Sequence, residues 1–316
     1  MGEAGRDGKE RAAREAGMSG GLGRGMGWLP DRPDIRDYTA GTALIRSVFE
    51  GAGTKGAGQG RRKGSAPPSA VDLRPWCSPV EDQGRLGSCT ANAGAGVIEY
   101  YERRAFGRHV EASRLFLYKV TRNLMKLKGD TGAALRTTMG AMVLFGVPPE
   151  EHWPYSDAGE VFDREPPAFC YAFAQNYQTI QYYRHDPPGS PADEILGRVK
   201  AGLAAGHPVM FGFTVYDSIG QADATGRIPF PGPRERIEGG HAVVAVGYDD
   251  KMRVANAAGG KNGGETEGAF LIRNSWGPGW GERGYGWLPY AYLSRGLAED
   301  FWSVLKKEWI DTGEFG

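Results

Sequence analysis

The sequence predicts an α+β fold in two subdomains, a helical one followed by a β-rich one. Three observations carry this prediction. Apolar residues at helical spacing dominate about 69–176, extended apolar runs dominate about 177–316, and a Gly-rich segment, 1–68, precedes both. Helices followed by strands along one chain are typical of α+β proteins, in which the two kinds of element form separate layers.

The first 68 residues differ in composition from the rest of the chain. Segments 1–26 and 51–65 are rich in glycine and charge, and they hold too few large apolar residues to offset the entropy of ordering them. Between them, 27–38 carries tryptophan, leucine, isoleucine and tyrosine and is interrupted by prolines, which favours an extended segment. We expect a partly flexible leader over 1–68, a possible pro-segment, in which 27–38 docks on a surface.

Three helices are predicted in the first part of the domain 69–316. The first covers Ser88–Arg104, with Ser88 as a plausible N-cap, because apolar residues recur there at helical spacing. The second covers 113–127 and the third 132–145. Together they make the helical part, about 69–176.

Extended apolar runs in the last part of the chain predict strands. Glycine- and proline-rich loops separate these runs, notably 217–240 and 257–268. The predicted strands cover 177–183, 208–215, 241–248, 269–273 and 284–289.

Composition excludes several classes of protein. The 38 basic residues balance the 38 acidic ones, so no basic excess points to nucleic acid as a partner. No apolar run approaches the ~18 residues of a membrane helix, and no secretory signal opens the chain, so a cytoplasmic protein with no membrane contact is expected. A Gly51-x-Gly53-x-x-Gly56 match to the dinucleotide-binding fingerprint lacks a preceding strand and a following helix, so no nucleotide cofactor is expected from it.

The cysteine pattern indicates a reducing compartment. Cys77, Cys89 and Cys170 are too few for a disulfide framework, and nothing in the sequence argues for a Cys77–Cys170 pair. No C-x-x-C pair exists, so no metal site is expected. One of the three cysteines is therefore a candidate catalytic thiol.

Cys89 has the surroundings of a nucleophile. It lies in the first turn of a predicted helix, where the macrodipole favours thiolate over thiol. Gly84 and Gly87 precede it and allow close approach of backbone to a substrate. Gln83 lies six residues earlier, and its side-chain amide together with the Cys89 backbone N–H could hold a developing oxyanion.

A base and an orienting amide follow later in the chain. His241 opens an apolar run directly after a Gly pair, which presents an imidazole at a strand end. Asn274 ends the next predicted strand and could fix the tautomer of the histidine. Trp276 could shield the Asn–His hydrogen bond from water.

These motifs together resemble those of a known family. Gln83-x-x-x-Gly87-Ser88-Cys89, Gly240-His241-Ala242-Val243 and Arg273-Asn274-Ser275-Trp276-Gly277 occur in the order found in papain-like (C1-type) cysteine peptidases. The resemblance covers about 70–316 well and 27–38 weakly, where the leader resembles that of bacterial members.

The resemblance implies a fold and a reaction. The fold is a helical left subdomain and a β-barrel-like right subdomain with the active-site cleft between them. Cys89 would attack a peptide carbonyl and form a thioester, His241 would act as general acid and base, and Asn274 would orient it. A peptide or protein substrate is implied, cleaved as by an endopeptidase, with no cofactor.

Substrate-binding residues are also implied by the resemblance. Gly132, beside Asp130, resembles the glycine-containing edge against which family members pair substrate backbone. Gly212, Gly240 and Ala242 resemble positions near the main specificity pocket. The leader segment 27–38 could also inhibit the enzyme intramolecularly.

The chain departs from the family pattern in four places. Leu86 stands where many secreted members have a disulfide-bonded cysteine, and Thr90 replaces the usual aromatic residue. A Gly-rich insertion covers about 257–268. Glu10-x-x-x-Arg14 alone is too little to predict the helical inhibitory pro-segment of the family.

The residues leave two other functions open. A Cys/His/Asn site can also catalyse amidase or transpeptidase reactions on non-standard amides. A catalytically weak peptide-binding homologue is the non-enzymatic alternative, although the expected polar residues are all present.

Overall fold

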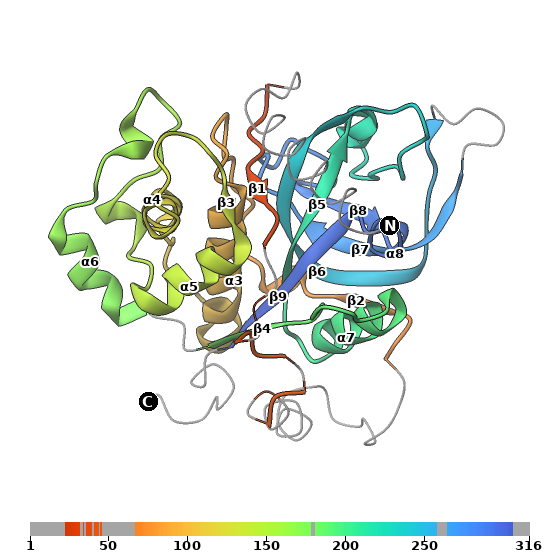
Figure 1. The fold of residues 1–316 in the computed structure, drawn as a ribbon, viewed down its shortest axis with the longest axis horizontal. Helices are drawn as coiled ribbons and strands as arrows, with labels where there is room; N and C mark the ends of the chain where they lie inside the picture. The colour runs from red at the N-terminus through yellow and green to blue at the C-terminus, as the bar shows by residue number, and fades with distance from the viewer. Residues whose placement is uncertain are drawn as a thin grey trace.

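The computed structural model describes residues 23–31, 34, 36–39, 41–43, 45, 67–177, 181–257 and 264–305. The predicted flexible stretch 51–65, the Gly51 to Gly56 motif and the Glu10–Arg14 pair lie outside the described residues, as do most of 1–26 and the middle of the 257–268 insertion. Figure 1 shows a helical half on the left and a sheet half on the right, as the α+β prediction requires.

The helical half is built around α3, Cys89–Phe106, which packs against strand β6 of the other half. Helix α4, Arg114–Leu124, and helix α5, Leu135–Leu144, pack on α3 and on each other. Helix α6, Ala168–Ala174, lies at the outer edge of this half (Figure 1). All three predicted helices exist.

The ends of the predicted helices need correction. Ser113 is the N-cap of α4, and its side chain accepts a hydrogen bond from the Phe116 N–H. The predicted helix over 132–145 begins only at Leu135, because Ala133 and Ala134 form the short strand β3. These two residues pair with another segment of the chain. Such a pairing cannot be recognised from the local periodicity of apolar residues.

The other half is a seven-stranded sheet with the order β4-β9-β5-β6-β7-β8 and with β2 paired to β6. The pairs within it are antiparallel. Its strands are β2 Ala70–Asp72, β4 Gln181–Arg184, β5 Val209–Tyr216, β6 Ile237–Val254, β7 Thr266–Arg273, β8 Tyr285–Pro289 and β9 Ala298–Leu305.

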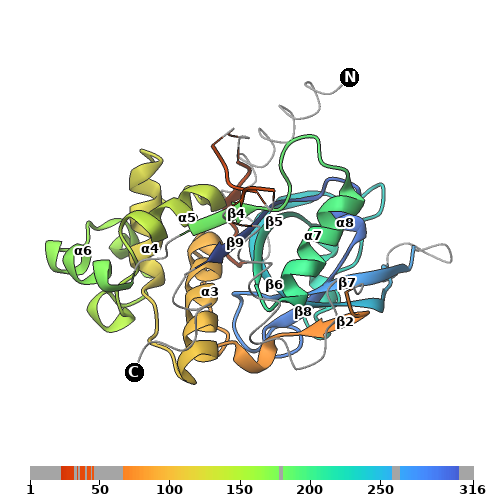
Figure 2. The ribbon, with the colours of Figure 1, turned by 90° about the horizontal axis from the view of Figure 1, so that it is seen from below.

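The prediction found five of these strands and missed two, β2 and β9. It also missed helix α7, Ala192–Ala204, which packs against β5 and β6 (Figure 2). Pro191 at the N-cap and two acidic residues in the first turn were usable signals for this helix. The short helix α8, Ala291–Ser294, lies beside α7.

One leader segment lies between the two halves. Strand β1, Trp28–Leu29, pairs in parallel with β3, and it also contacts β5 and β6 (Figure 1). About 105 residues separate the paired strands in sequence. Strand β1, which belongs to the predicted docking segment 27–38, therefore lies in the junction where α3 meets the sheet.

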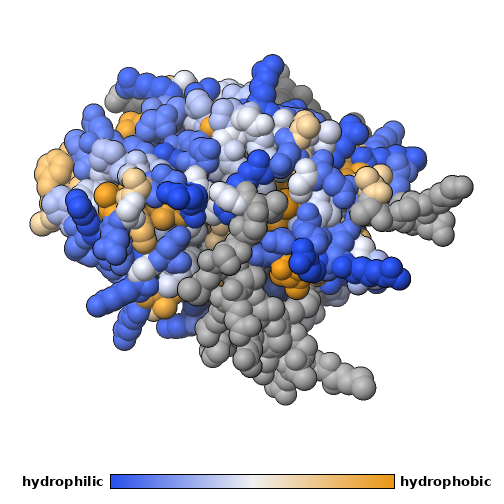
Figure 3. All heavy atoms as spheres, turned by 90° about the horizontal axis from the view of Figure 1, so that it is seen from above, coloured by the Kyte–Doolittle hydropathy of each residue, from blue (hydrophilic) through white to orange (hydrophobic). Residues whose placement is uncertain are grey.

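Buried apolar side chains form two large clusters, one around α3 with its neighbouring helices and one on the far face of the sheet. Trp28 belongs to the first cluster. The face in Figure 3 is mainly hydrophilic, with scattered hydrophobic patches. None of the helices in the described ranges is long and apolar enough to cross a membrane.

Candidate active site

Cys89 is the first residue of α3 and is fully buried. The backbone N–H of Ala242, which follows His241 on β6, is one of the groups that lower the pKa of the Cys89 thiol. The sulfur therefore lies at the contact between α3 and β6, beside the histidine. Residues 152 positions apart meet here because α3 packs directly on β6.

His241 and Asn274 form the expected pair. His241 Nε2 lies 2.7 Å from Asn274 Oδ1, and because an amide oxygen only accepts, Nε2 carries the proton. His241 Nδ1 has no hydrogen-bond partner within the described ranges, so its lone pair is unoccupied. Trp276 stacks on the imidazole with ring centroids 4.6 Å apart, which keeps water from the Asn–His bond.

Gln83 is held in one orientation by a residue that sequence analysis did not assign. Ser275 Oγ donates to Gln83 Oε1 at 2.5 Å, which turns the Nε2 donor of the amide in the opposite direction. That Nε2 donates to Leu86 O at 2.7 Å and to Gly25 O at 3.0 Å. Ser275 lies within the Asn-Ser-Trp-Gly motif, so its position next to Asn274 was the available signal.

The N-cap position predicted for Ser88 is confirmed, but its side chain does not cap the helix. Ser88 is the N-cap residue of α3, but its side chain makes no capping bond. Its hydroxyl instead bonds Tyr155 OH at 2.6 Å, and Tyr155 OH donates to Gln83 O at 2.8 Å. The serine oxygen accepts from Asn92 Nδ2 at 3.1 Å rather than from a backbone N–H at the helix end, and through Tyr155 the serine supports the backbone of the Gln83 turn.

The leader crosses this site closely. Gly27 O accepts a hydrogen bond from Ala133 N at 2.7 Å, and a Cβ on Gly132 would lie 2.2 Å from Gly27 O. The Gly27 backbone N–H is another group that lowers the pKa of Cys89, so the leader lies against the thiol. Gly132 therefore lies against extended leader backbone, and its part in substrate binding stays a prediction.

Trp28 occupies a site on the sheet side of the cleft, where it is 3 % exposed. A Cβ on Gly212 would lie 1.9 Å from the indole ring, and one on Gly240 would lie 3.0 Å from it. These two glycines, together with Asp300, define what we call the Trp28 site. The predicted pocket residues Gly212 and Gly240 therefore face a leader side chain.

Asp130, predicted beside the substrate-binding edge, has its carboxylate hydrogen-bonded within the domain. Its carboxylate accepts from Gly87 N at 2.9 Å and from Tyr118 OH at 2.5 Å. It therefore holds the turn before Cys89, close to Leu86. All three cysteines are free thiols, so the structure contains no Cys77–Cys170 bond.

Burial keeps the candidate catalytic pair neutral. It raises the pKa of Cys89 to about 11, against the opposing effect of backbone N–H groups. It lowers the pKa of His241 to about 4, against the opposing effect of Asn274. With the leader docked, the pair is a thiol and a neutral imidazole near pH 7, which is not the reactive thiolate and imidazolium.

A buried ionic group ties the two halves together next to the site. Arg273, which precedes Asn274, crosses to the helical half and donates to Ser78 Oγ at 3.1 Å and to Pro79 O at 2.7 Å. Ser78 Oγ in turn donates to the buried Glu99 of α3. Burial raises the pKa of Glu81 to about 8, and the neighbouring Glu99 acts in the same direction.

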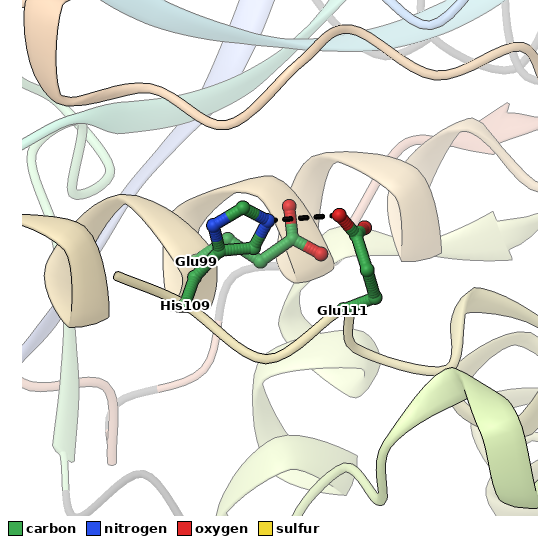
Figure 4. Close-up of side chains that lie close together, drawn as sticks. All are labelled: Glu99, His109 and Glu111. Carbon is green, nitrogen blue, oxygen red and sulfur yellow. Dashed lines mark hydrogen bonds and ion pairs between the residues drawn. The ribbon is translucent and has the colours of Figure 1, made fainter.

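One group of side chains in the described ranges has the geometry of a metal site. Figure 4 shows Glu99, His109 and Glu111, whose ligand atoms lie within 4.8 Å of one another. Glu99 already accepts from Ser78 Oγ and Ala112 N, and His109 pairs with Glu111 at 2.9 Å. These bonds account for the three side chains without an ion.

Comparison with known proteins decides the family. The model of the papain family cysteine proteases matches residues 67–299. This protein belongs to the papain family. A peptidase C1-like protein of Acanthamoeba polyphaga mimivirus is 32 % identical over 296 residues, which cover 90 % of this chain and 87 % of the relative.

Other papain-family proteins agree with this assignment. Xylellain, a cysteine protease from Xylella fastidiosa, superposes with a TM-score of 0.69 at 36 % identity, covering 90 % of this chain and 97 % of xylellain. Cathepsin K of Gallus gallus is 30 % identical over 230 residues, which cover 70 % of this chain and 58 % of the relative. This papain-family chain is therefore a cysteine-type peptidase with the α+β papain-like fold.

Proposed function

We propose that Cys89 is the nucleophile of this cysteine peptidase, with His241 as general acid and base and Asn274 as its orienting partner. The observation that carries the assignment is the 2.7 Å bond between His241 Nε2 and Asn274 Oδ1, which leaves Nδ1 free beside the Cys89 helix end. Gln83 Nε2 and the Cys89 backbone N–H would hold the oxyanion. The amidase, transpeptidase and non-enzymatic alternatives are not favoured by the relatives.

The chemistry follows from these positions. The thiol proton of Cys89 passes to His241 Nδ1, and the thiolate attacks the peptide carbonyl carbon to form a tetrahedral oxyanion. That intermediate collapses to a thioester while Nδ1–H protonates the departing amine. Water, deprotonated by the imidazole, then hydrolyses the thioester and restores the thiol. Asn274 keeps the ring in the required tautomer throughout.

The leader, within 1–68, would act as an intramolecular inhibitor of the peptidase domain, 69–316. Two contacts support this role. Gln83 Nε2 donates to Gly25 O, whereas the leader N–H that lowers the pKa of the thiol belongs to Gly27, two residues later. The carbonyl at the oxyanion donor and the backbone at the nucleophile therefore come from different peptide groups. The leader blocks the site but is not held as a peptide to be cleaved.

The leader is also anchored by charge outside the site. Arg136, in the first turn of α5, pairs with Asp37 at 2.5 Å and with Asp34 at 3.1 Å, and its backbone N–H donates to Asp31. Arg24 pairs with Asp223 at 2.6 Å on the sheet side. Contacts at both ends of the segment oppose its release.

Peptide hydrolysis tests the assignment. An internally quenched peptide library and an unfolded protein substrate would be incubated with the full chain and with its Trp28→Ala variant. This substitution weakens the binding of the leader in the site. Cleavage should disappear in Cys89→Ala and persist in Cys170→Ala, a matched substitution of a buried thiol away from the site. Internal fragments seen by mass spectrometry would mark an endopeptidase. Cleavage that persists without Cys89 would overturn the assignment.

A further inference from the structure

Arg136, in the first turn of α5, is a cation that the proposed catalytic roles do not account for. Its guanidinium pairs with Asp37 at 2.5 Å and with Asp34 at 3.1 Å, and its side chain is 26 % exposed. Both acids belong to the leader. Within the described part of the peptidase domain itself, no carboxylate forms an ion pair with this arginine.

The helix end beside this cation also takes its acceptor from the leader. Helix α5 begins at Leu135, and its N-cap residue, Ala134, makes no side-chain capping bond. The backbone N–H of Arg136 donates instead to Asp31 Oδ2 at 2.8 Å. The first N–H groups of a helix carry partial positive charge and lack partners within the helix, so a carboxylate is a favoured acceptor there.

The pairing of β1 with β3 brings this cation into line with the thiol. Strand β1 lies opposite 133–134. Gly27, just before β1, has the N–H that lowers the pKa of Cys89, and Asp31, just after it, is bound by Arg136. Four residues of chain therefore lead from the thiol to the cation, which is roughly 13 Å at about 3.3 Å per residue. A substrate on the same edge would bring a side chain three to five residues from the cleaved bond to Arg136.

Displacement of the leader leaves this cation without an acid. The guanidinium loses both carboxylates, and the helix N–H loses the oxygen to which it donates. Arg184, which also lies near Asp37, differs because it keeps Asp186, a partner within the domain, at 3.0 Å. The vacated position at Arg136 therefore presents positive charge from a side chain and from a helix end together.

We propose that Arg136 and the N-terminal end of α5 form a subsite that selects an acidic side chain, glutamate or aspartate, three to five residues from the cleaved bond. This inference rests on the proposed peptidase function, since it concerns the substrate that replaces the leader. The leader aspartates are the built-in ligands of this subsite. A carboxylate accepts from the guanidinium and from the helix N–H, whereas the amide of glutamine offers one uncharged oxygen and an NH₂ group that neither donor can use.

Paired substrates that differ only in this charge test the proposal. The full chain would carry Asp34→Asn and Asp37→Asn, so that these leader carboxylates do not compete for the guanidinium even when the leader is only partly displaced. Peptides with glutamate or glutamine would be compared at the third, fourth and fifth residues on either side of the cleaved bond. The remaining leader docking lowers kcat/KM equally for both members of a pair, so their ratio is unaffected by it.

Glutamate should be favoured in kcat/KM by about fivefold or more at one of these positions. An exposed ion pair contributes up to about fivefold and a hydrogen bond to a charged group about 10- to 100-fold, and the partly exposed guanidinium lies between these cases. Salt screens such charges, so the preference should fall toward one as NaCl is raised from about 0.05 M to about 1 M.

Arg136→Gln in the same background identifies the residue responsible. It keeps the helix N–H and much of the side-chain length but removes the charge. The glutamate preference should fall to within about twofold in Arg136→Gln and persist in Arg253→Gln, a matched change of an exposed arginine that also pairs with two carboxylates, those of Glu265 and Glu267. A ratio near one at all of these positions, or an unchanged ratio in Arg136→Gln, would overturn the proposal.

A second measurement works even if no peptide is cleaved. Peptides with a chloroacetamide at one end alkylate a cysteine without breaking an amide bond, and Cys89 labelling is read by peptide mass spectrometry. With the variable residue three to five residues from the chloroacetamide, the glutamate peptide should label Cys89 at least about fivefold faster than its glutamine partner, and not in Arg136→Gln. Equal rates for every pair would refute the subsite, whereas a rate difference without any cleavage would support the subsite and refute only the peptidase function.

Discussion

Replacing Trp28 with alanine should open the cleft. The side chain is 3 % exposed, and an aromatic residue of this kind buries roughly 150–250 Å². At about 25 cal/mol per Å², its burial contributes up to about 4–6 kcal/mol, an upper estimate because the released leader is itself partly compact. Measured truncations of buried aromatic residues cost about 3–5 kcal/mol. The lower part of that range shifts the docking equilibrium by about 10² to 10³-fold.

Alkylation of Cys89 reports this opening. If docking and release are faster than labelling, the labelling rate follows the population of the open form. Intact-mass and peptide mass spectrometry of iodoacetamide-treated protein would therefore show Cys89 labelled about 10² to 10³-fold faster in Trp28→Ala, up to the limit set by a fully open cleft. Trp76→Ala, at a tryptophan 45 % exposed, is the matched control and should leave the rate unchanged.

Two other thiols distinguish leader release from general loss of structure. Cys77 and Cys170 are buried free cysteines away from the leader contact with Cys89. They should stay protected in Trp28→Ala. An unchanged Cys89 rate, or equal acceleration at all three cysteines, would refute the conclusion that Trp28 holds the leader in the cleft.

Three further predictions follow from the site and its surroundings. Burial raises the pKa of Asp31 to about 6, with Asp37 acting in the same direction and Arg184 and Arg136 opposing. The docked leader therefore binds a proton more tightly than the released one, so docking is strongest below about pH 4, weakens as pH rises to about 6, and is constant above it. The Cys89 labelling rate of the unaltered chain relative to Asp31→Asn should rise about 10- to 100-fold across this window, and a flat ratio would contradict the linkage. Gln83→Ala should lower kcat by about 10² to 10³-fold with little change in KM, as expected for loss of an oxyanion donor, whereas Gln221→Ala, away from the site, should leave kcat unaltered. Arg273→Met should remove the cation beside Glu81 and Glu99 and cost about 3–5 kcal/mol, seen as a fall in Tm of roughly 6–15 °C by calorimetry; a fall under about 2 °C would show that the buried group does not need its arginine.

Local sequence was sufficient to predict helices α3, α4 and α5, and it pointed to the candidate catalytic residues. Cys89 follows a glycine-containing turn and opens a helix, and His241 and Asn274 each belong to a short motif around a strand. Such signals can be recognised in the sequence because they consist of residues that are neighbours along the chain. Helix α7 also carries local signals, a proline at its N-cap and an acidic first turn, although it was not predicted.

Other features depend on contacts that no local pattern contains. Strand β9 was missed because Glu299 and Asp300 interrupt its apolar alternation, and the bulge that explains them is visible only against β5. Ser275 orients Gln83 across 192 residues of chain. Side chains with such distant partners look like ordinary polar residues in sequence.

Motifs along the chain were enough for the family, the α+β fold class and the chemistry expected of a cysteine at a helix end with a histidine on one strand and an asparagine after another. Three features came only from the tertiary structure: Gly27 and Trp28 lie across the site, burial raises the pKa of Cys89 and lowers that of His241, and Asp300 meets the indole. Motifs encode covalent neighbours, whereas burial and pKa depend on which distant segment excludes water from a site.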